Sequence, residues 1–419
     1  MKTILTGATV IDGTGSPAVP GASVIIDGEH IADIRAGGDG HPADGGSRIY
    51  ELDDRYTIIP GLIDCHDHVG HPGLGPAAQR ISAVPHAVAI VARALRETVE
   101  AGVTTVRDAG GLGYGFKAAV DEGLFVGPRL VLSLAIMSRT GGLGDPCGIF
   151  GYGSEQWIIP GVPSGVCDGP EEGRRKVREL HRSGAGAIKV AMTGGIRSGA
   201  LQPGFSAAEV EAIVDEAHVL GMRVLCHCHG GAGLRDALAA GVDSIDHGLY
   251  LAEDESSLER MAQDGTFYVP TMLVLRYHES HGEGPASDTV RRLREQHRRG
   301  IARAAELGVR IAMGTDAGAF GHRHQAAELE LLVDAGLSPM EALVASTSSS
   351  AACLGLEDQV GTLAPGFGAD LIVVDGDPLA DIRILQDPER IRLVMKAGSP
   401  VTDHLAASVA AEGSLHQAD

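Results

Sequence analysis

The chain has 419 residues, of which 44% are hydrophobic, enough to bury a substantial core in one large domain or two smaller ones. Its 34 basic and 55 acidic residues give a formal net charge of −21, which argues against nucleic acid or an anionic membrane as a partner. The sequence contains no run of about 18 apolar residues that could span a membrane.

The N-terminal segment and the cysteines indicate a cytoplasmic protein. Residues 1–7 lack an apolar region with a cleavage site, so no signal peptide is expected. Six cysteines in so long a chain do not form a disulfide framework. Cys147 and Cys167 share one loop and are compatible with a disulfide or, as we expect, with free thiols. Cys226 and Cys228 flank His227, but on a strand they would face away from it and be inert buried thiols.

The two ends of the chain predict a small β-sandwich. Residues 3–6, 23–26 and 31–34 form short alternating segments with glycine turns between them, and residues 370–374 and 391–396 repeat this pattern. Neither end buries enough apolar surface alone. We therefore expect residues 1–56 and 358–402 to form one sandwich, and residues 403–419 to be a polar tail.

Between residues 57 and 357, short apolar runs alternate with longer helical patterns. This alternation implies parallel pairing, and eight such units predict an α/β fold with a closed (β/α)8 TIM barrel. The expected strands are Thr57–Asp64, Val103–Arg107, Pro128–Leu134, Ala187–Val190, Arg223–Cys228, Ser244–His247, Thr266–Pro270 and Val309–Met313. The expected helices are Val84–Ala101, Glu171–Arg182, Ala207–Leu220, Ser257–Asp264 and Asp288–Leu307.

Two segments have no periodicity. The loop Ser138–Gly169 is rich in glycine and proline, holds the single tryptophan Trp157, and is either a lid or pocket wall or a surface excursion. His278 and His281 are expected in a hydrophilic, solvated loop.

His66 and His68 follow an apolar strand-like run and are the strongest chemical signal. Side chains on a strand alternate faces, so both histidines point one way while Cys65 and Asp67 point the other. Two imidazoles on one face can bind one transition-metal ion, and for the pair alone the alternative is two histidines hydrogen-bonded in a turn.

Polar residues recur where the other predicted strands end. Because barrel strands deliver their carboxyl-terminal residues to one mouth, groups from five strands are expected to converge there. They are His66, His68, Lys189, His227, His229, His247 and Asp316.

These residue types suit divalent metal ions. His66 and His68 would hold one ion, and His227 and His247 would hold a second or complete the same site. Asp316 can bind through one oxygen and take a proton from a metal-activated water through the other, since a divalent ion lowers the pKa of its water to about 7. Zinc, manganese, cobalt and iron all tolerate these ligands.

Lys189 has two readings, because an ammonium beside a divalent metal is repelled. It is either a strand-end lysine in an ion pair or an uncharged amine that carbon dioxide has carboxylated. The carboxylated form is an anion suited to bridging two ions. The apolar run 186–188 favours the uncharged amine through desolvation.

The chain at this point resembles the amidohydrolase superfamily, most closely its imidazolonepropionase-like and Xaa-Pro dipeptidase (prolidase)-like branch. The resemblance covers nearly the whole chain. It rests on the stretches 60–68, 104–108, 188–190 with 193–195, 226–230, 244–248, 314–316, and 361–366 with 369–371.

The resemblance implies a barrel with a flanking β-sandwich and a centre of two divalent metal ions, usually zinc. We expect Asp316, as the general base, and His247 to act in catalysis, and His229 to contact the substrate, a structural hydrogen bond being its alternative. The implied ligands are His66, His68, carboxylated Lys189, His227, His247 and Asp316.

The loop after the third strand departs from the family. Dipeptidase-like members commonly read Thr-Gly-Gly-His there, whereas this chain has Leu143, which cannot donate a hydrogen bond to a peptide carboxylate. A more apolar substrate is therefore favoured. Arg139 and Arg197 are alternative anion partners or solvated loop charges. Tyr268 is a substrate contact or a core aromatic, and His324 a substrate contact or an ordinary helix-start residue.

Taken together, these features predict a hydrolase that cleaves an amide-type C–N bond of a small molecule, such as a dipeptide, N-acyl amino acid, carbamate or urea, by metal-activated hydroxide. An ester, lactone or phosphotriester hydrolase with the same centre is the alternative. A non-enzymatic metal-binding protein would lack ligands, and none is missing here. We further expect a homo-oligomer.

Overall fold

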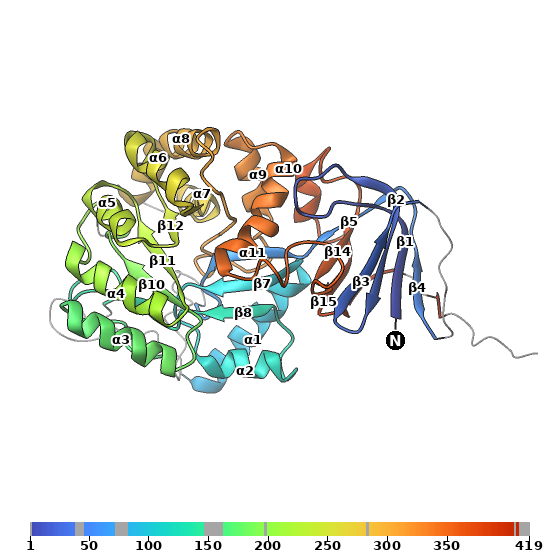
Figure 1. Cartoon of the computed structure of the whole chain (residues 1–419), viewed down its shortest axis with the longest axis horizontal. Coiled ribbons are helices and arrows are strands. Elements are labelled where there is room, and N and C mark those ends of the chain that lie inside the picture. Colours follow the sequence, from blue (N-terminus) through green and yellow to red (C-terminus); the bar gives the residue numbers. More distant parts are fainter. Residues whose placement is uncertain are drawn as a thin grey trace, which may run out of the picture.

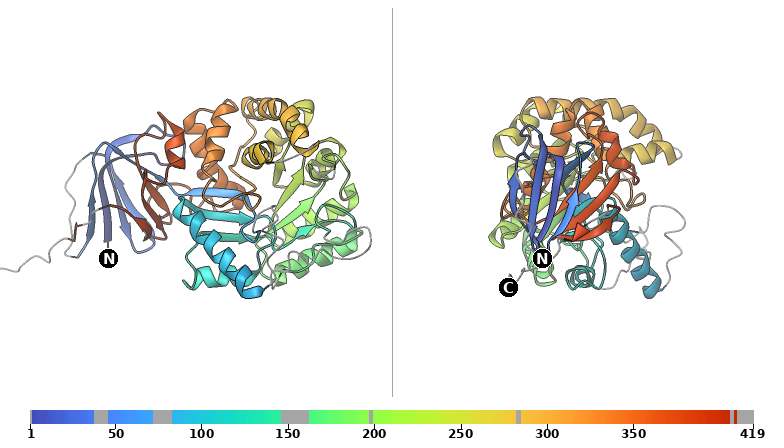
Figure 2. Two further views of the ribbon diagram at one scale, coloured as in Figure 1. Left: turned by 180° about the vertical axis from the view of Figure 1, so that it is seen from behind. Right: turned by 90° about the vertical axis from the view of Figure 1, so that its right-hand side faces the viewer.

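The computed structural model describes residues 2–37, 46–71, 83–145, 162–196, 199–281, 285–405 and 408–409 (Figure 1). The fold is of the α/β class. Parallel strands with helices around them form the larger part, and a mixed sheet that contains strands from both ends of the chain lies at one end of the molecule (Figures 1 and 2).

The mixed sheet has nine strands, and β5 joins its N-terminal and C-terminal parts. β5 pairs in parallel with β1 and antiparallel with β14. Both parts also share one core, which includes Leu5, Tyr50, Leu371 and Leu393. The expected association of the two ends is confirmed, although hydrogen bonds connect all nine strands into one sheet and the two-layered sandwich stays a prediction. The strands are β1 (Lys2–Val10), β2 (Val19–Asp27), β3 (His30–Arg35), β4 (Arg48–Glu51), β5 (Tyr56–Pro60), β14 (Leu371–Asp375), β15 (Ile391–Lys396), β16 (Ser399–Asp403) and β17 (Ser408–Val409).

The middle of the chain forms a three-stranded and a five-stranded parallel sheet. The three-stranded sheet contains β6 (Leu62–Asp67), β7 (Val103–Asp108) and β8 (Arg129–Leu132). The five-stranded sheet contains β9 (Ile136–Met137), β10 (Ala187–Ala191), β11 (Arg223–Cys228), β12 (Ser244–His247) and β13 (Phe267–Val269). Of the expected third strand, 128–134, β8 covers residues 129–132; the backbone turns at Leu134, whose φ is 63°, and β9 follows beyond the expected range.

The expected first strand, 57–64, is also two strands. Its first half is β5 of the mixed sheet, and its second half belongs to β6. Gly61 lies between them against Thr104, where a Cβ would come within 2.2 Å of the threonine hydroxyl oxygen. Only glycine allows the chain to pass so closely from one sheet to the next. The domain limits at residues 56 and 57 stay a prediction.

Hydrogen bonds link the two parallel sheets at both edges. At one edge, Gly186 N donates to Leu132 O over 2.8 Å. At the other, residues 310–317 lie between β13 and β6: Ala312 N donates to Tyr268 O over 2.9 Å, and Asp316 N donates to His66 O over 2.7 Å. This segment takes the place of the expected eighth strand, but it forms isolated bridges rather than a regular ladder.

The helices surround the parallel strands (Figure 2). All five expected helices are present within three residues of their predicted limits, while six others were not predicted. Local signals fix some ends; at α10, for example, Ser338 and Glu341 form a reciprocal capping box. The helices are α1 (Val84–Glu100), α2 (Tyr114–Asp121), α3 (Pro170–Arg182), α4 (Ala207–Val219), α5 (Gly231–Ala240), α6 (Glu255–Asp264), α7 (Met272–His281), α8 (Pro285–Glu306), α9 (Ala327–Asp334), α10 (Pro339–Ala345) and α11 (Ser348–Leu354).

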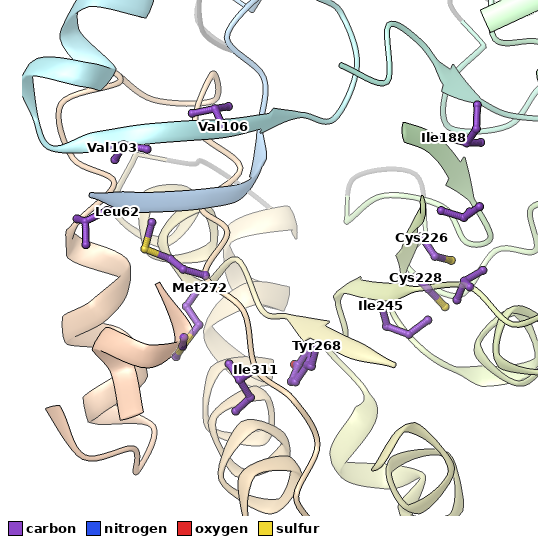
Figure 3. Close-up of a cluster of buried hydrophobic side chains, with 14 of the residues drawn as sticks. Leu62, Val103, Val106, Ile188, Cys226, Cys228, Ile245, Tyr268, Met272 and Ile311 are labelled. Carbon is purple, nitrogen blue, oxygen red and sulfur yellow. The ribbon is translucent and has the colours of Figure 1, made fainter. Parts of the chain in front are cut away.

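The large core cluster collects apolar side chains from the parallel strands (Figure 3). Cys226 and Cys228 lie in this cluster beside Ile245, as the strand alternation predicted for inert thiols. Burial raises the pKa of the Cys226 thiol well above its ordinary value. Across the described residues, no helix combines the length and apolar character needed to cross a bilayer.

Candidate active site

Side chains from β6, β12 and the segment after residue 310 meet at the carboxyl ends of the strands. His66 Nε2 lies 3.5 Å, and His68 Nε2 3.3 Å, from the same atom, Asp316 Oδ1. His66, His247 and Asp316 each offer one ligand atom within 4.8 Å of the others. On the opposite face of β6, Cys65 Sγ contacts Ser350 O, so the predicted alternation is confirmed.

The other two expected ligands lie beside this group. The His227 ring centroid is 4.4 Å from that of His247. Lys189 Nζ is 3.4 Å from His66 Nδ1 and donates to Asp246 Oδ2 over 2.8 Å. All six side chains that the sequence singled out as ligands are thus brought together.

Hydrogen-bond acceptors of the protein orient His66 and His68, the two histidines at the end of β6. His66 Nδ1 lies 2.8 Å from Asp246 Oδ2, and His68 Nδ1 lies 2.8 Å from Gly110 O. A carboxylate and a carbonyl only accept, so each Nδ1 carries the proton. Both Nε2 lone pairs are therefore left facing Asp316, the arrangement that a metal-binding histidine requires.

His227 of β11 and His247 of β12 likewise each donate a hydrogen bond from one ring nitrogen to an acceptor of the protein. His227 Nε2 donates to Gly194 O over 3.2 Å, which leaves the lone pair on Nδ1. His247 Nδ1 lies 2.8 Å from Thr271 Oγ1, whose own proton goes to Pro270 O. The threonine must therefore accept from His247, which leaves the lone pair on Nε2.

Electrostatics keep His227, His247 and Asp316 in the protonation states that metal binding needs. Burial, reinforced by the charge of Lys189, lowers the pKa of His227 to about 3. Burial also lowers the pKa of His247 well below its ordinary value. The pKa of Asp316 would rise on burial, but the His66 and His68 imidazoles beside it hold it well below its usual range. His227 and His247 are therefore neutral imidazoles near an ionised carboxylate. Burial alone would lower the pKa of His68, but the neighbouring Asp316 raises it above its ordinary value.

The backbone is strained at this site. Of the five non-glycine residues with positive φ in the described part of the chain, three lie here: His247 at 76°, Thr271 at 53° and Asp316 at 58°. Each such residue costs on the order of 1–3 kcal/mol and persists only where the surrounding structure requires it.

Asp246 is a residue of the site that sequence reasoning missed. It is fully buried, and besides Lys189 and His66 it accepts from Ser244 Oγ over 2.9 Å and has Arg107 at 3.9 Å. The expected strand alternation would turn Asp246 away from the side that His247 faces. The positive φ of His247 breaks that alternation, so both side chains reach the site. The signal for Asp246 that the sequence offered was its position directly before His247, an expected metal ligand.

The donor set fits a divalent transition metal, because the imidazole lone pairs of His66, His68 and His247 lie near a carboxylate oxygen of Asp316. Lys189 is the exception as an ammonium, and it is neutralised by Asp246. His66, His247 and Asp316 therefore form a candidate metal site.

A cavity of about 230 Å³ opens beside these ligands. His229 lines it and is 2% exposed, and neither of its ring nitrogens has a hydrogen-bond partner among the described residues. Leu143 also lines it, as the sequence suggested. The lining residues are Leu143, Gly195, Ile196, His227, His229, His247, Val274, Leu275, His278 and Asp316.

Several expected substrate contacts need correction. Tyr268 is fully buried, and its hydroxyl donates to the backbone carbonyl of His247 over 3.2 Å, so it supports a ligand rather than lining the cavity. His324 is exposed in the turn before α9. Arg139 donates to the carbonyls of Thr140, Pro203 and Gly204 and braces its own loop.

Other residues were placed incorrectly or lie outside the described residues. His278 lies on α7 and lines the cavity, instead of lying in a solvated loop. The pocket residues Ile196, Val274 and Leu275 were not predicted, because α7 was not expected from the sequence. Arg197, and residues 146–161 of the long loop with Trp157, lie outside the described residues.

A larger cavity of about 600 Å³ lies elsewhere, between the ends of α8 and α10. Its one acidic lining group, Glu341, is already bound to Ser338 in the helix cap. We therefore place the chemistry in the smaller cavity, where the histidines converge.

Comparison with known proteins agrees with this geometry. The model of the Amidohydrolase family matches residues 57–401. The ochratoxinase of Aspergillus niger is 34% identical over 363 residues, which cover 82% of this chain and 75% of the relative. The imidazolonepropionase of Rhizorhabdus wittichii is 28% identical over 376 residues, which cover 81% and 85%.

Among solved structures, a prolidase complexed with N-methylphosphonate-L-proline matches with a TM-score of 0.88 and 30% identity, covering 96% of this chain and 100% of that chain. The chain belongs to the amidohydrolase family, a family of enzymes. The resemblance to its imidazolonepropionase-like and prolidase-like members is confirmed.

Proposed function

We propose that this protein is a metal-dependent hydrolase that cleaves an amide-type C–N bond of a small molecule. The observation that carries the proposal is the orientation of four histidines. Each has one ring nitrogen bound to a protein acceptor, which leaves its other nitrogen with a lone pair, and the free nitrogens of His66, His68 and His247 lie near Asp316. The family name and the prolidase among the similar structures support an amide bond over an ester or phosphotriester.

Asp316 is the proposed general base. Its ionised carboxylate lines the cavity and can take a proton from the attacking water and pass it to the leaving amine. Its Oδ1 atom lies 3.5 Å from His66 Nε2 and 3.3 Å from His68 Nε2. His247 is the second proposed catalytic residue, and its Nδ1 atom donates a hydrogen bond to Thr271 Oγ1.

We propose that two divalent metal ions, with zinc as the first candidate for both, are held by His66, His68, His227, His247 and Asp316. When bound, such ions supply Lewis acidity toward a carbonyl and lower the pKa of a water to about 7.

Lys189 is proposed to be carboxylated and to bridge the ions. It is 1% exposed, follows an apolar run and has its Nζ atom 3.4 Å from His66 Nδ1, beside the other proposed ligands. Carboxylation would replace the Lys189–Asp246 ion pair by two neighbouring anions, so the lysine side chain would have to move away from Asp246.

We also propose that the two parallel sheets and residues 310–317 close into a (β/α)8 barrel. The family membership supports this, as do the hydrogen bonds at both sheet edges. Homo-oligomerisation and a cytoplasmic location stay predictions.

The test is a metal count by elemental analysis on wild type and Lys189→Ala, together with hydrolysis of matched amide, ester and phosphotriester substrates. We expect close to two ions per wild-type chain, loss of one or both in Lys189→Ala, and the highest kcat/KM on an amide. Unchanged metal content and activity in Lys189→Ala would exclude the bridging role. Hydrolysis of the ester or phosphotriester alone would exclude the proposed amide bond.

A further inference from the structure

One side of the cavity is aliphatic. Leu143 comes from the loop after β9, Ile196 from the segment after β10, and Val274 and Leu275 from α7. Ile196, Val274 and Leu275 also belong to a packed apolar cluster with Leu249. We call Leu143, Ile196, Val274 and Leu275 the aliphatic wall.

The start of α7 is held rigidly. Glu328 accepts from Met272 N over 2.8 Å and from Leu273 N over 2.7 Å, and it is fully buried. Two of the backbone amides that lack an intrahelical partner at a helix start are thereby satisfied. Val274 and Leu275, which follow directly, are therefore fixed before any ligand enters.

His229 is the polar counterpart of this wall. Its backbone is anchored by a hydrogen bond to Thr193 Oγ1 of 3.1 Å, and its ring lies 4.7 Å from that of His227. A buried imidazole without a partner is rare, because a lost hydrogen bond to water must be replaced. Its position in the cavity wall points to a ligand as the partner.

We propose that this site selects uncharged amides that carry a bulky alkyl or aryl group, and that His229 hydrogen-bonds to the polar atoms beside that group. The proposal rests on the amide-hydrolase function given above and names its substrate class. The aliphatic wall gains from contact with an apolar group, whereas a carboxylate seated against it would lose its water, and none of the four side chains of the wall can donate a hydrogen bond in exchange. Leu143, whose exposed fraction is 37%, sits at the accessible end of the wall and acts as a specificity residue.

The test uses two compounds that differ only in a carboxylate: N-benzoyl-L-phenylalanine and N-benzoyl-2-phenylethylamine. Each is hydrolysed by one water to benzoate and an amine. We expect metal-loaded wild type to prefer the uncharged compound by at least about tenfold in kcat/KM. Calorimetry with the metal-loaded Asp316→Asn variant measures binding without turnover. This variant should bind the uncharged compound more tightly than N-benzoyl-L-phenylalanine.

Two variants complete the test. Leu143→Arg offers a cation at the wall and should shift the ratio toward the carboxylate, while the volume-conserving Leu143→Met should keep the wild-type ratio. Because Leu143 is partly exposed, both variants should fold. A preference for N-benzoyl-L-phenylalanine in both assays would overturn the inference and leave the hydrolase function standing. Tight binding of the uncharged compound without hydrolysis of any amide would instead overturn the proposed function.

Discussion

The two sides of the cavity are built in opposite ways. On the metal side, every imidazole is tied to a protein acceptor through one nitrogen, and Lys189 is paired with Asp246. On the wall side, four aliphatic side chains line the same cavity as His229, whose ring has no hydrogen-bond partner within the described part of the chain.

On the metal side the protein itself supplies the hydrogen-bond partners of the polar groups, whereas on the wall side a ligand must supply the partner of His229. Groups oriented by the fold can bind metal with little reorganisation, and their loss should abolish activity. Groups left without partners should decide which molecule binds. Substitutions on the metal side should therefore change occupancy and kcat, and substitutions on the wall side should change selectivity.

The largest effect is expected for Asp316→Asn. The amide cannot accept the proton of the attacking water, so kcat should fall about 10²- to 10⁴-fold. Steady-state kinetics with an amide substrate measures this, and Thr315→Ser serves as the neighbouring control, because it keeps the hydroxyl that donates to Asp64 over 2.6 Å. Activity within about tenfold of wild type would exclude Asp316 as the base.

Asp246→Asn should have the next largest effect. It removes the charge that neutralises Lys189 and weakens the acceptor that orients His66. Loss of an outer partner typically lowers metal affinity about 10- to 100-fold, and breaking a buried ion pair destabilises by about 3–5 kcal/mol. Competition with a chromophoric chelator and thermal unfolding measure the two effects. Ser244→Ala, which removes one hydrogen bond to the same carboxylate, should have a smaller effect on both; equal affinities in Asp246→Asn and wild type would contradict the role.

Glu328 links the wall to pH. Burial raises its pKa to about 8 from an ordinary value of 4.5. The folded protein therefore keeps a proton that the unfolded chain releases, and the stability from this group, full below pH 4.5, is lost as pH rises through 8. Glu328→Gln does not titrate and has no such loss. The Tm of the variant minus that of wild type should therefore increase from pH 5 to pH 9. Parallel Tm curves for the two proteins would refute this.

Tyr268→Phe should give the smallest effect. It removes a hydrogen bond to the His247 carbonyl of 3.2 Å while it keeps the buried ring. The expected destabilisation is about 1 kcal/mol, with metal content and substrate preference unchanged. A change in substrate preference would mean that Tyr268 belongs to the wall after all, as the sequence had left open.

Much of the candidate site could be predicted because it rests on local patterns. The period of two along β6 placed His66 and His68 on one face, and the strand ends placed Lys189, His227 and His247 near them. Asp246 could not be placed, because its orientation depends on the backbone turn at His247. The wall could not be found either, since α7 has too few regularly spaced apolar residues to stand out as a helix in the sequence.

Two features of the fold were likewise beyond local patterns. The run 57–64 is apolar throughout, so nothing in it reveals that its first half pairs with β14 while its second half pairs with β7. The eighth strand was expected from its apolar residues, but residues 310–317 pair with their neighbours only through the isolated bridges Tyr268–Ile311 and Asp67–Ala317.

The sequence by itself determined which residues can do chemistry and which strand each one ends. Only the tertiary structure decided which nitrogen of each histidine is free, because the deciding acceptors lie far away along the chain. Asp246, which sets the tautomer of His66, is 180 residues distant from it. A proton on an imidazole is placed by its nearest acceptor in space, and that neighbour is known only once the chain has folded.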